Sequence, residues 1–341
     1  MIDRFLHSWF AVVSVIFLTF GMAVVQGQDS VPGTEEAPRT AWGAPDLNGV
    51  WDFRTLTPFE RPSELADQAF FTEEEAAQFE AGRLAELSVR DDQEPADIVG
   101  NYNQLWFDPG DKVSETNQTS LVVDPPNGQV PPLTAVAAAN QASRERAREG
   151  VNRHVPTYGG FVDDLGPGMF AVRCVLGFNS GPPMTPGGYN QNVQVVQTPD
   201  HVVIVNEMVH SSRVVPLDGR SHLPAHMRQW MGDSRGHWEG DTLVVETTNF
   251  LRETSFRAGV TTADLSLTER FTRVANGTLM YEVTVEDPST WDQPWSYRMA
   301  MVKNDYPLYE YACHEGNYGL YNILAGAREH EAVADAAGVS R

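Results

Sequence analysis

The fold is decided by the stretch SLTERFTRVANGTLMYEVTVE, residues 266–286. On both sides of Asn276-Gly277, apolar and polar residues alternate, which is typical of strands with one buried face. Asn-Gly between two such runs is the strongest short-range signal for a β-hairpin with a two-residue turn. The stretch therefore predicts two antiparallel strands, 267–274 and 279–285.

A two-residue turn also predicts which residues face each other across the hairpin. In this register Thr272 faces Tyr281 and Arg270 faces Val283. The apolar face that carries Tyr281 would then also carry Arg270. A guanidinium in that position is either an edge residue that snorkels to solvent or a buried group held by a carboxylate or an aromatic face.

The same alternation recurs on both sides of the hairpin. Strands are expected at 48–54, 120–124, 193–197, 202–209, 213–217, 237–239, 243–247 and 296–302. Tight turns such as Thr198-Pro199-Asp200 and Gly240-Asp241 join most of the later strands without an intervening helix, which indicates an antiparallel meander. We predict a mainly β fold, either a barrel or a sandwich.

Three helices are expected outside the meander. A capping box formed by Thr72 and Glu75 begins a helix at 73–88. An Ala-rich stretch after Pro131-Pro132 predicts a second helix at 133–149, and a last helix is expected at 320–331.

A first strand with Gly49-x-Trp51, a following meander and an arginine on the apolar face of a late strand resemble the lipocalin and calycin arrangement. In that arrangement the tryptophan closes one end of a barrel and an arginine packs across it. The resemblance implies an antiparallel calycin-like barrel with a ligand cavity, to which the helices are insertions or flanking elements.

Three further phrases strengthen the resemblance: PLDGR at 216–220, GDSRGHWEGDTLVVET at 232–247 and CHEGNY at 313–318. They are similar to a group of secreted bacterial proteins that are associated with calycin-like barrels. The similarity runs in order over residues 45–330 and implies one barrel domain, 47–331, followed by a C-terminal tail, 332–341. No assigned chemistry comes with this group.

The N-terminus predicts export. Arg4 precedes an apolar run from Trp9 to Val25, and Val25-Gln26-Gly27 suits a signal peptidase, so residues 1–27 are interpreted as a cleaved signal peptide. The alternative is a retained membrane anchor, since the run approaches the ~20 residues that span a bilayer; no Lys/Arg cluster follows it, which favours cleavage. Residues 28–46 are expected to form a flexible leader, and the mature protein is expected to be periplasmic or secreted.

The chain is strongly acidic. Its 341 residues include 46 acidic and 24 basic ones, a net charge of −22, and loss of residues 1–27 removes only Asp3 and Arg4 from this balance. Such a charge repels phosphates and anionic lipid headgroups, so neither nucleic acid nor a membrane surface is an expected partner. A small-molecule ligand is expected instead, and the oligomeric state stays open.

The two cysteines, Cys174 and Cys313, stand far apart in an exported chain, where pairing is the default expectation. Two separate buried thiols are the alternative. Their spacing does not suit a two-cysteine redox site.

The densest polar and aromatic segment, residues 207–241, suggests acid–base chemistry. Imidazole moves protons near neutral pH, and a carboxylate beside it fixes its tautomer, so a site in this segment could perform acid–base work. His222 and Arg220 are its candidate catalytic residues. The alternative is a solvated loop with structural turns at 217–219 and 232–234. Ligand contacts are expected at Trp51, His210, Asp218, Trp230, Trp238, Arg270 and Tyr281.

No metal site is predicted. His222 and His226 have the spacing of a helical metal pair, but Pro224 between them fits only the first turn of a helix. Leu223 stands where a metalloprotease motif has its glutamate, and local spacing provides no third ligand.

The phrase at 313–318 is a second candidate site. A bridge at Cys313 would immobilise the neighbouring backbone, so that His314 could act as a base, Glu315 as its carboxylate partner or an acid, and Tyr318 as a proton donor. The alternative is a structural cap before the last helix, with Glu315 as an anion at the helix N-terminus.

The sequence lacks a Gly-x-Ser-x-Gly motif, a phosphate-binding glycine loop and redox-cofactor signatures, so no cofactor is expected. The leading hypothesis is a cofactor-independent isomerase, lyase or hydrolase that acts on an apolar or aromatic molecule in a barrel cavity. The alternative is a non-catalytic binding protein with the same ligand class. An envelope structural protein would need exposed adhesive surface, which the acidic composition does not favour.

Overall fold

The computed structural model describes residues 37–88, 107–147, 149, 174–251 and 262–338. The expected signal peptide, 1–27, and the first part of the expected leader lie outside these residues. None of the helices in the described ranges is both long and apolar enough to cross a membrane.

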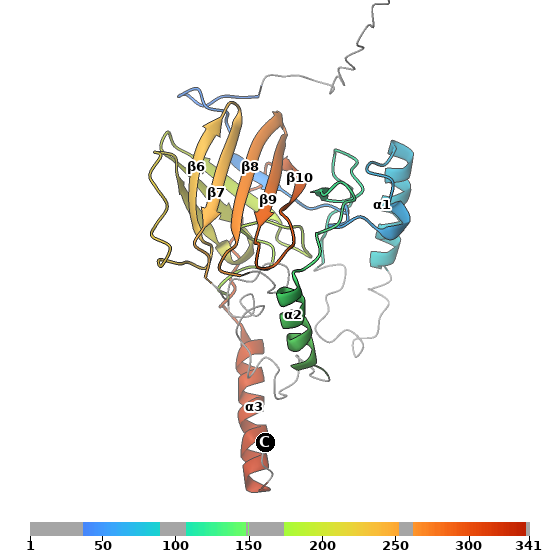
Figure 1. The fold of residues 1–341 in the computed structure, drawn as a ribbon, viewed down its shortest axis with the longest axis vertical. Helices are drawn as coiled ribbons and strands as arrows, with labels where there is room; N and C mark the ends of the chain where they lie inside the picture. The colour runs from blue at the N-terminus through green and yellow to red at the C-terminus, as the bar shows by residue number, and fades with distance from the viewer. Residues whose placement is uncertain (1–36, 89–106, 148, 150–173, 252–261, 339–341) are drawn as a thin grey trace, which may run out of the picture. The chain divides into compact units, whose positions relative to one another are not determined.

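One antiparallel sheet of ten strands dominates the fold (Figure 1). Across the sheet the strands follow the order β5-β4-β3-β1-β10-β9-β8-β7-β6, and β2 pairs with β10 beside this path. The strands are β1 (Gly49–Asp52), β2 (Val122–Asp124), β3 (Asn192–Gln197), β4 (His201–Asn206), β5 (Ser212–Pro216), β6 (Asp233–Glu239), β7 (Thr242–Thr248), β8 (Ser266–Ala275), β9 (Thr278–Glu286) and β10 (Trp295–Asn304).

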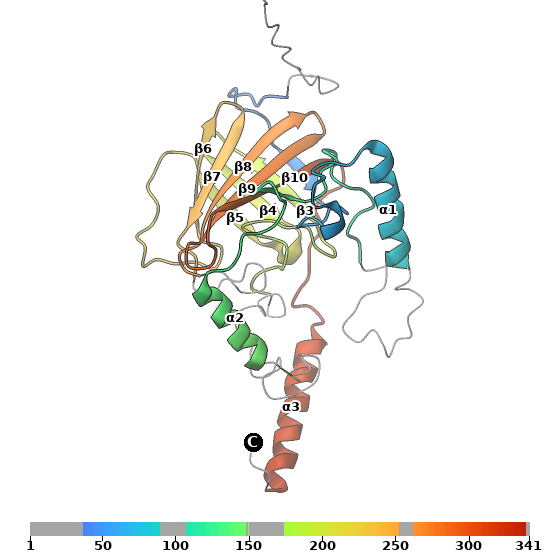
Figure 2. The same ribbon diagram turned by 45° about the vertical axis from the view of Figure 1, so that its right-hand side comes forward.

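The sheet curls until its two end strands, β5 and β6, lie next to each other (Figure 2). Gly236 on β6 makes this approach possible, since a Cβ there would lie only 2.9 Å from the side chain of Val215 on β5 and 2.7 Å from that of Leu217. The sheet therefore forms a barrel. The prediction of a mainly β, antiparallel barrel is confirmed, and this architecture is compatible with a calycin-like fold.

The described ranges contain three α-helices, α1 (Glu73–Ser88), α2 (Ala135–Ala147) and α3 (Tyr318–Ala336). All three were expected from the sequence, with α3 beginning two residues earlier and ending five residues later than predicted. The capping box of α1 is formed: the Thr72 N–H donates to Glu75 Oε2 at 2.8 Å, and the Glu75 N–H donates to Thr72 Oγ1 at 3.3 Å. The Thr72 N–H, and after it the Thr72 hydroxyl, donate to the Glu75 carboxylate and thereby lower the pKa of Glu75.

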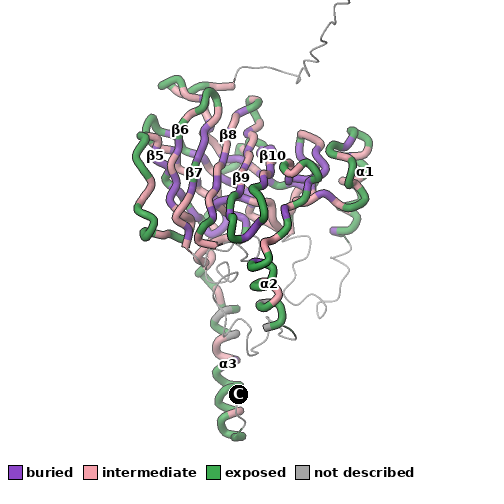
Figure 3. Tube along the Cα trace, viewed as in Figure 1, coloured by how far each residue is buried: buried purple, intermediate pink, exposed green. Residues whose placement is uncertain are grey.

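Many inward-facing residues of the strands are buried and fill the barrel, and Figure 3 shows buried residues along the labelled strands. Trp51 is fully buried, and its indole Nε1 donates to the Leu47 carbonyl at 2.9 Å. The guanidinium of Arg273 lies 5.4 Å from the centre of the Trp51 ring. An arginine therefore packs across the first-strand tryptophan, as in the arrangement that the sequence resembles.

The expected register of the β8–β9 hairpin is wrong by one residue. A β-bulge between Arg273 and Ala275 shifts the strand, so that Phe271 faces Tyr281 and Arg270 faces Glu282. Because successive side chains point to opposite faces, this single extra residue moves Arg270 to the outside and Arg273 to the inside.

Two strand boundaries also differ from expectation. β6 begins at Asp233, within a phrase that reads as a turn, because its hydrogen bonds to β7 extend to the pair Asp233–Thr248. β4 ends at Asn206 instead of Val209, because Met208–His210 form a 3-10 turn in which Val209 has φ 59° and His210 has φ 42°.

The leader ends earlier than predicted. Residues 37–46 lie against the barrel, where Gln197 Nε2 donates to the Pro45 carbonyl at 3.0 Å and the Asp46 N–H donates to Pro38 O at 2.7 Å. Arg39 also pairs with Asp241 at 2.8 Å. This segment has no apolar periodicity and is held by hydrogen bonds. Its contact with the barrel could therefore not be predicted from composition.

Candidate functional site

A buried ion pair occupies the interior of the barrel. Arg213 on β5 donates to Glu269 on β8 through two hydrogen bonds of 2.5 and 2.8 Å, and Tyr281 on β9 donates to the same carboxylate at 2.7 Å. All three side chains are buried. Burial lowers the pKa of Arg213, but the facing carboxylate raises it more, so the guanidinium stays charged. Burial is also the main reason why the pKa of Tyr281 is raised, so its hydroxyl stays protonated.

The protein itself fills the space beside this ion pair. Met184 is fully buried in the barrel core, its N–H donates to Tyr281 Oη at 3.1 Å, and its carbonyl accepts from Tyr297 Oη at 2.5 Å. The segment that carries Met184 thus enters the barrel and uses polar groups that a bound molecule could otherwise engage.

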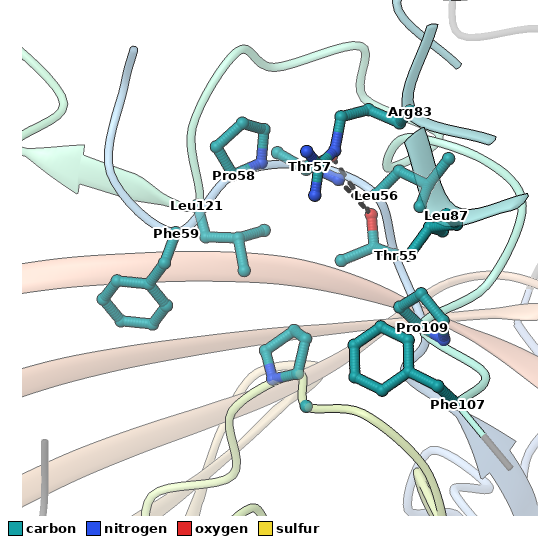
Figure 4. Close-up of a pocket in the computed structure, with 12 residues that line it drawn as sticks. Thr55, Leu56, Thr57, Pro58, Phe59, Arg83, Leu87, Phe107, Pro109 and Leu121 are labelled. Carbon is teal, nitrogen blue, oxygen red and sulfur yellow. Dashed lines mark hydrogen bonds between the residues drawn. The ribbon is translucent and has the colours of Figure 1, made fainter. Parts of the chain in front are cut away.

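A pocket with a cavity volume of about 200 Å³ lies beside α1 (Figure 4). Its lining comes from five separate parts of the chain, which are the segment after β1, the last turns of α1, the segment at 107–109, the residue before β2 and the segment that carries Met184. The lining residues are Thr55, Leu56, Thr57, Pro58, Phe59, Arg83, Leu87, Phe107, Pro109, Leu121, Pro186 and Gly187.

The pocket is mostly apolar and touches the core. Leu121 is buried, and Phe59 packs against Tyr297 with ring centres 5.1 Å apart. Pro109 and Phe107 lie below Arg83 in the view of Figure 4. A pocket of this size suits a molecule smaller than a typical drug, because drug-sized sites have volumes of about 300–1,000 Å³.

The polar groups of the pocket are few. The hydroxyls of Thr55 and Thr57 bond to each other at 3.1 Å, and Thr57 Oγ1 also accepts the Ser114 N–H at 2.8 Å. Arg83, which pairs with Glu86 on the exposed side of α1, is the only lining residue that carries a full charge. The pocket can therefore bind an apolar body and attract an acceptor or anionic group, but it brings no acid and base together.

The structure places none of the sequence-predicted site residues in this pocket. His222 instead belongs to a cluster at the start of β6, where its Nδ1 lies 2.9 Å from Asp233 Oδ2. The same carboxylate accepts the Leu223 N–H at 2.9 Å and pairs with Arg235 at 2.7 Å. Burial alone would raise the pKa of Asp233, but the hydrogen bonds from Leu223, His222 and Arg235 lower it overall.

The other candidates in the 207–241 segment are dispersed. Arg220 and Asp218 form an exposed ion pair two residues apart, and the hydrogen bonds from Arg220 lower the pKa of Asp218 to about 2. Trp238 packs partly on the core, whereas Trp230 is exposed. None of these four residues lines the pocket beside α1.

The second predicted site is also open to solvent. His314, Glu315 and Tyr318 are exposed, and within the described residues no side-chain hydrogen bond or ion pair joins them to each other or to His222. The disulfide between Cys313 and Cys174 is formed, as expected. His210 Nδ1 lies 3.2 Å from the Tyr311 carbonyl, which can only accept, so His210 holds the chain beside this bridge.

The remaining predicted ligand contacts have structural surroundings. Trp51 and Tyr281 are fully buried in the core, and Arg270 lies outside the barrel, where it pairs with Glu239 at 2.7 Å and lowers the pKa of that carboxylate. In the described parts of the chain no three His, Cys, Asp or Glu side chains are grouped so that they could hold a metal ion.

Sequence reasoning missed the Arg213–Glu269 pair and the pocket. Arg213 and Glu269 each occupy an inward position of a strand. Once the register is known, two opposite charges at inward positions indicate a buried ion pair. The pocket gave a weaker signal, since Phe107 is an isolated aromatic residue in a polar stretch of the sequence. Its lining comes from segments that no local pattern connects.

No protein-family model matches the chain. A search of curated proteins also finds no match. Among solved structures, a crystal structure of a mutant of the fluorescent protein UnaG matches with 12% identity and a TM-score of 0.22, covering 40% of this chain and 86% of that one. A likeness this weak carries no argument about function.

Proposed function

We propose that the protein is a non-catalytic, exported binding protein for a small, largely apolar molecule that carries an anionic or hydrogen-bond-accepting group. The observation that supports this function is the lining of the pocket beside α1, where apolar side chains surround the cavity and Arg83 supplies the charge. The apolar walls favour the body of the ligand through burial, and Arg83 selects the acceptor group and orients it.

Export to the periplasm or the medium is part of this proposal. It is supported by the signal-peptide pattern of residues 1–27 and by the disulfide, which persists in an oxidising compartment. We also propose that the chain belongs to the secreted calycin-like group, on the basis of the sequences at 216–220, 232–247 and 313–318. N-terminal sequencing of the protein recovered from outside the cytoplasm tests export. We expect the mature chain to begin near Gln28.

The binding site is tested by thermal stabilisation against pairs of small aromatic carboxylates and their neutral amides. We expect carboxylates to raise the melting temperature of the wild type more than their amides do. Arg83→Gln should remove this difference, because it deletes the charge and keeps a polar side chain. Leu87→Trp should abolish stabilisation by both members of a pair, since the larger ring fills the cavity.

Arg146→Gln on α2 is the matched control, because Arg146 is an exposed helical arginine outside the pocket. It should respond to the ligands like the wild type. Unchanged stabilisation in Leu87→Trp would mean that the ligand binds elsewhere, and the assignment of the pocket would be wrong.

Acid–base catalysis is the second candidate, and the contact between His222 and Asp233 favours it. A carboxylate at Nδ1 fixes the imidazole tautomer and leaves Nε2 as the atom that can take a proton from a substrate. Mass analysis of every stabilising compound separates the two functions. Conversion by the wild type that disappears in His222→Ala would establish an enzyme, whereas unaltered recovery from both proteins supports a binding protein.

A further inference from the structure

Five of the ten tyrosines in the chain lie within residues 305–321, which we call the tyrosine strap. Four of them are far more exposed than aromatic side chains usually are: Tyr306 at 73%, Tyr309 at 69%, Tyr318 at 72% and Tyr321 at 68%. Aromatic rings gathered in water carry a free-energy cost, and such gatherings mark interaction sites. The fold does not need these four rings, because its core lies inside the barrel.

The strap is also acidic. It contains Asp305, Glu310 and Glu315 and neither Lys nor Arg. All three carboxylates are exposed, and none of them forms an ion pair within the described part of the chain. Burying them against a neutral or acidic partner would cost desolvation energy without compensation.

Covalent and polar contacts fix the strap to the barrel. The disulfide from Cys313 to Cys174 holds its middle, together with the hydrogen bond from His210 to the Tyr311 carbonyl. At its beginning the Tyr306 N–H donates to Asn304 Oδ1 at 3.0 Å, and Asn304 in turn donates to Asn192 at 2.9 Å. A segment that is held in place before binding loses less conformational entropy when a partner docks.

We propose that the tyrosine strap is a docking surface for a lysine- or arginine-rich segment of a partner protein. Tyrosine faces attract ammonium and guanidinium groups through the ring quadrupole, and the three carboxylates supply the complementary charge. The net charge of −22 on the whole chain steers a cationic partner toward the molecule, while the local rings and carboxylates determine where it binds. No residue of the strap lines the ligand pocket, so the docking surface can be tested independently of ligand binding.

The probe is a fluorescent peptide of about ten residues with alternating lysine and glycine, which spans roughly 30 Å when extended. We expect the mature protein to bind it and to bind neither the same peptide with glutamate in place of lysine nor a neutral oligosaccharide. Tyr306→Ser with Tyr309→Ser should weaken binding at least about tenfold, whereas Tyr→Phe at both positions should retain it, because the ring faces remain.

Charge provides the second test. Neutralisation of the strap by Asp305→Asn, Glu310→Gln and Glu315→Gln should weaken binding by a similar factor. The matched control is Asp67→Asn, Glu73→Gln and Glu74→Gln, which removes the same charge near the start of α1 and should change binding much less. An unchanged melting temperature shows that each variant is folded.

Equal weakening by the two charge variants would overturn the proposal, because binding would then follow only the total charge. Equal binding by the Tyr→Ser variant and the wild type would overturn it as well. Binding of the neutral oligosaccharide in preference to the lysine peptide would assign the rings to another class of partner.

Discussion

Glu269 is the residue on which the polar interior of the barrel depends. Its carboxylate accepts hydrogen bonds from both Nη atoms of Arg213 and from the hydroxyl of Tyr281, and no part of it is exposed to solvent. Removal of one member of such a pair leaves the other charge buried without compensation.

Glu269→Gln should therefore lower the free energy of unfolding by about 3–5 kcal/mol, because the charge of Arg213 loses its partner. Urea denaturation at neutral pH measures this loss. The double variant Arg213→Met with Glu269→Leu should be more stable than the single variant, since it buries no unpaired charge. A double variant less stable than Glu269→Gln would show that the ion pair contributes net stability.

Arg270 and Arg273 show how one residue changes the chemistry of a whole face. Both are arginines of β8, three positions apart, but Arg273 packs over Trp51 inside the barrel and Arg270 pairs with Glu239 outside it. The bulge between Arg273 and Ala275 decides between these positions. An Asn-Gly turn does not encode a bulge beside it, so the hairpin is predictable and the inward arginine is not.

At the scale of elements, the approach of β5 to β6 closes the barrel. These strands are the two ends of the sheet, and β6 carries Gly236 at the point where the side chains of Val215 and Leu217 come closest. The glycine needs no unusual backbone angle here. Its function is to leave space.

Gly236→Ala should destabilise the protein by about 1–3 kcal/mol, because the new methyl group overlaps with Val215 and Leu217 and forces the strands apart. Thermal and urea unfolding measure the effect. Gly277→Ala is the matched control, since a Cβ at Gly277 meets no atom within 4 Å. Equal stability of the two variants would mean that β5 and β6 separate without cost.

The helices were more predictable than the closure of the sheet. α1 has the bounds expected from its capping box, and α2 begins after Thr134, whose hydroxyl accepts the Ala137 N–H at 3.2 Å. Caps are made by residues a few positions apart, so the local sequence contains all of their information. The contact between β5 and β6 depends on the register of every strand between them.

At the scale of the whole molecule, the disulfide spans most of the barrel. Cys174 and Cys313 are 139 residues apart, and β3 to β10 lie between them. A bridge that closes a long loop restricts the unfolded chain and thereby stabilises the folded one.

Cys174→Ser with Cys313→Ser should lower the free energy of unfolding by roughly 2–5 kcal/mol. The midpoint of urea unfolding measures the change, and reduction of the wild type should reproduce it. If reduced and oxidised wild type unfold at the same urea concentration, the bridge adds no net stability to the fold.

Sequence alone determined the mainly β class, the meander and the helices, because periodicity, turns and caps act over a few residues. It favoured pairing of the cysteines and left two separate buried thiols as the alternative. Only the tertiary structure decided the inward side of β8, the Arg213–Glu269 pair, the closure at Gly236 and the pocket beside α1. These features join residues far apart in the chain, and a one-residue shift in a strand exchanges its two faces. His222 and His314 are the clearest case: each suits acid–base chemistry by residue type, but their separate positions follow from the path of the chain.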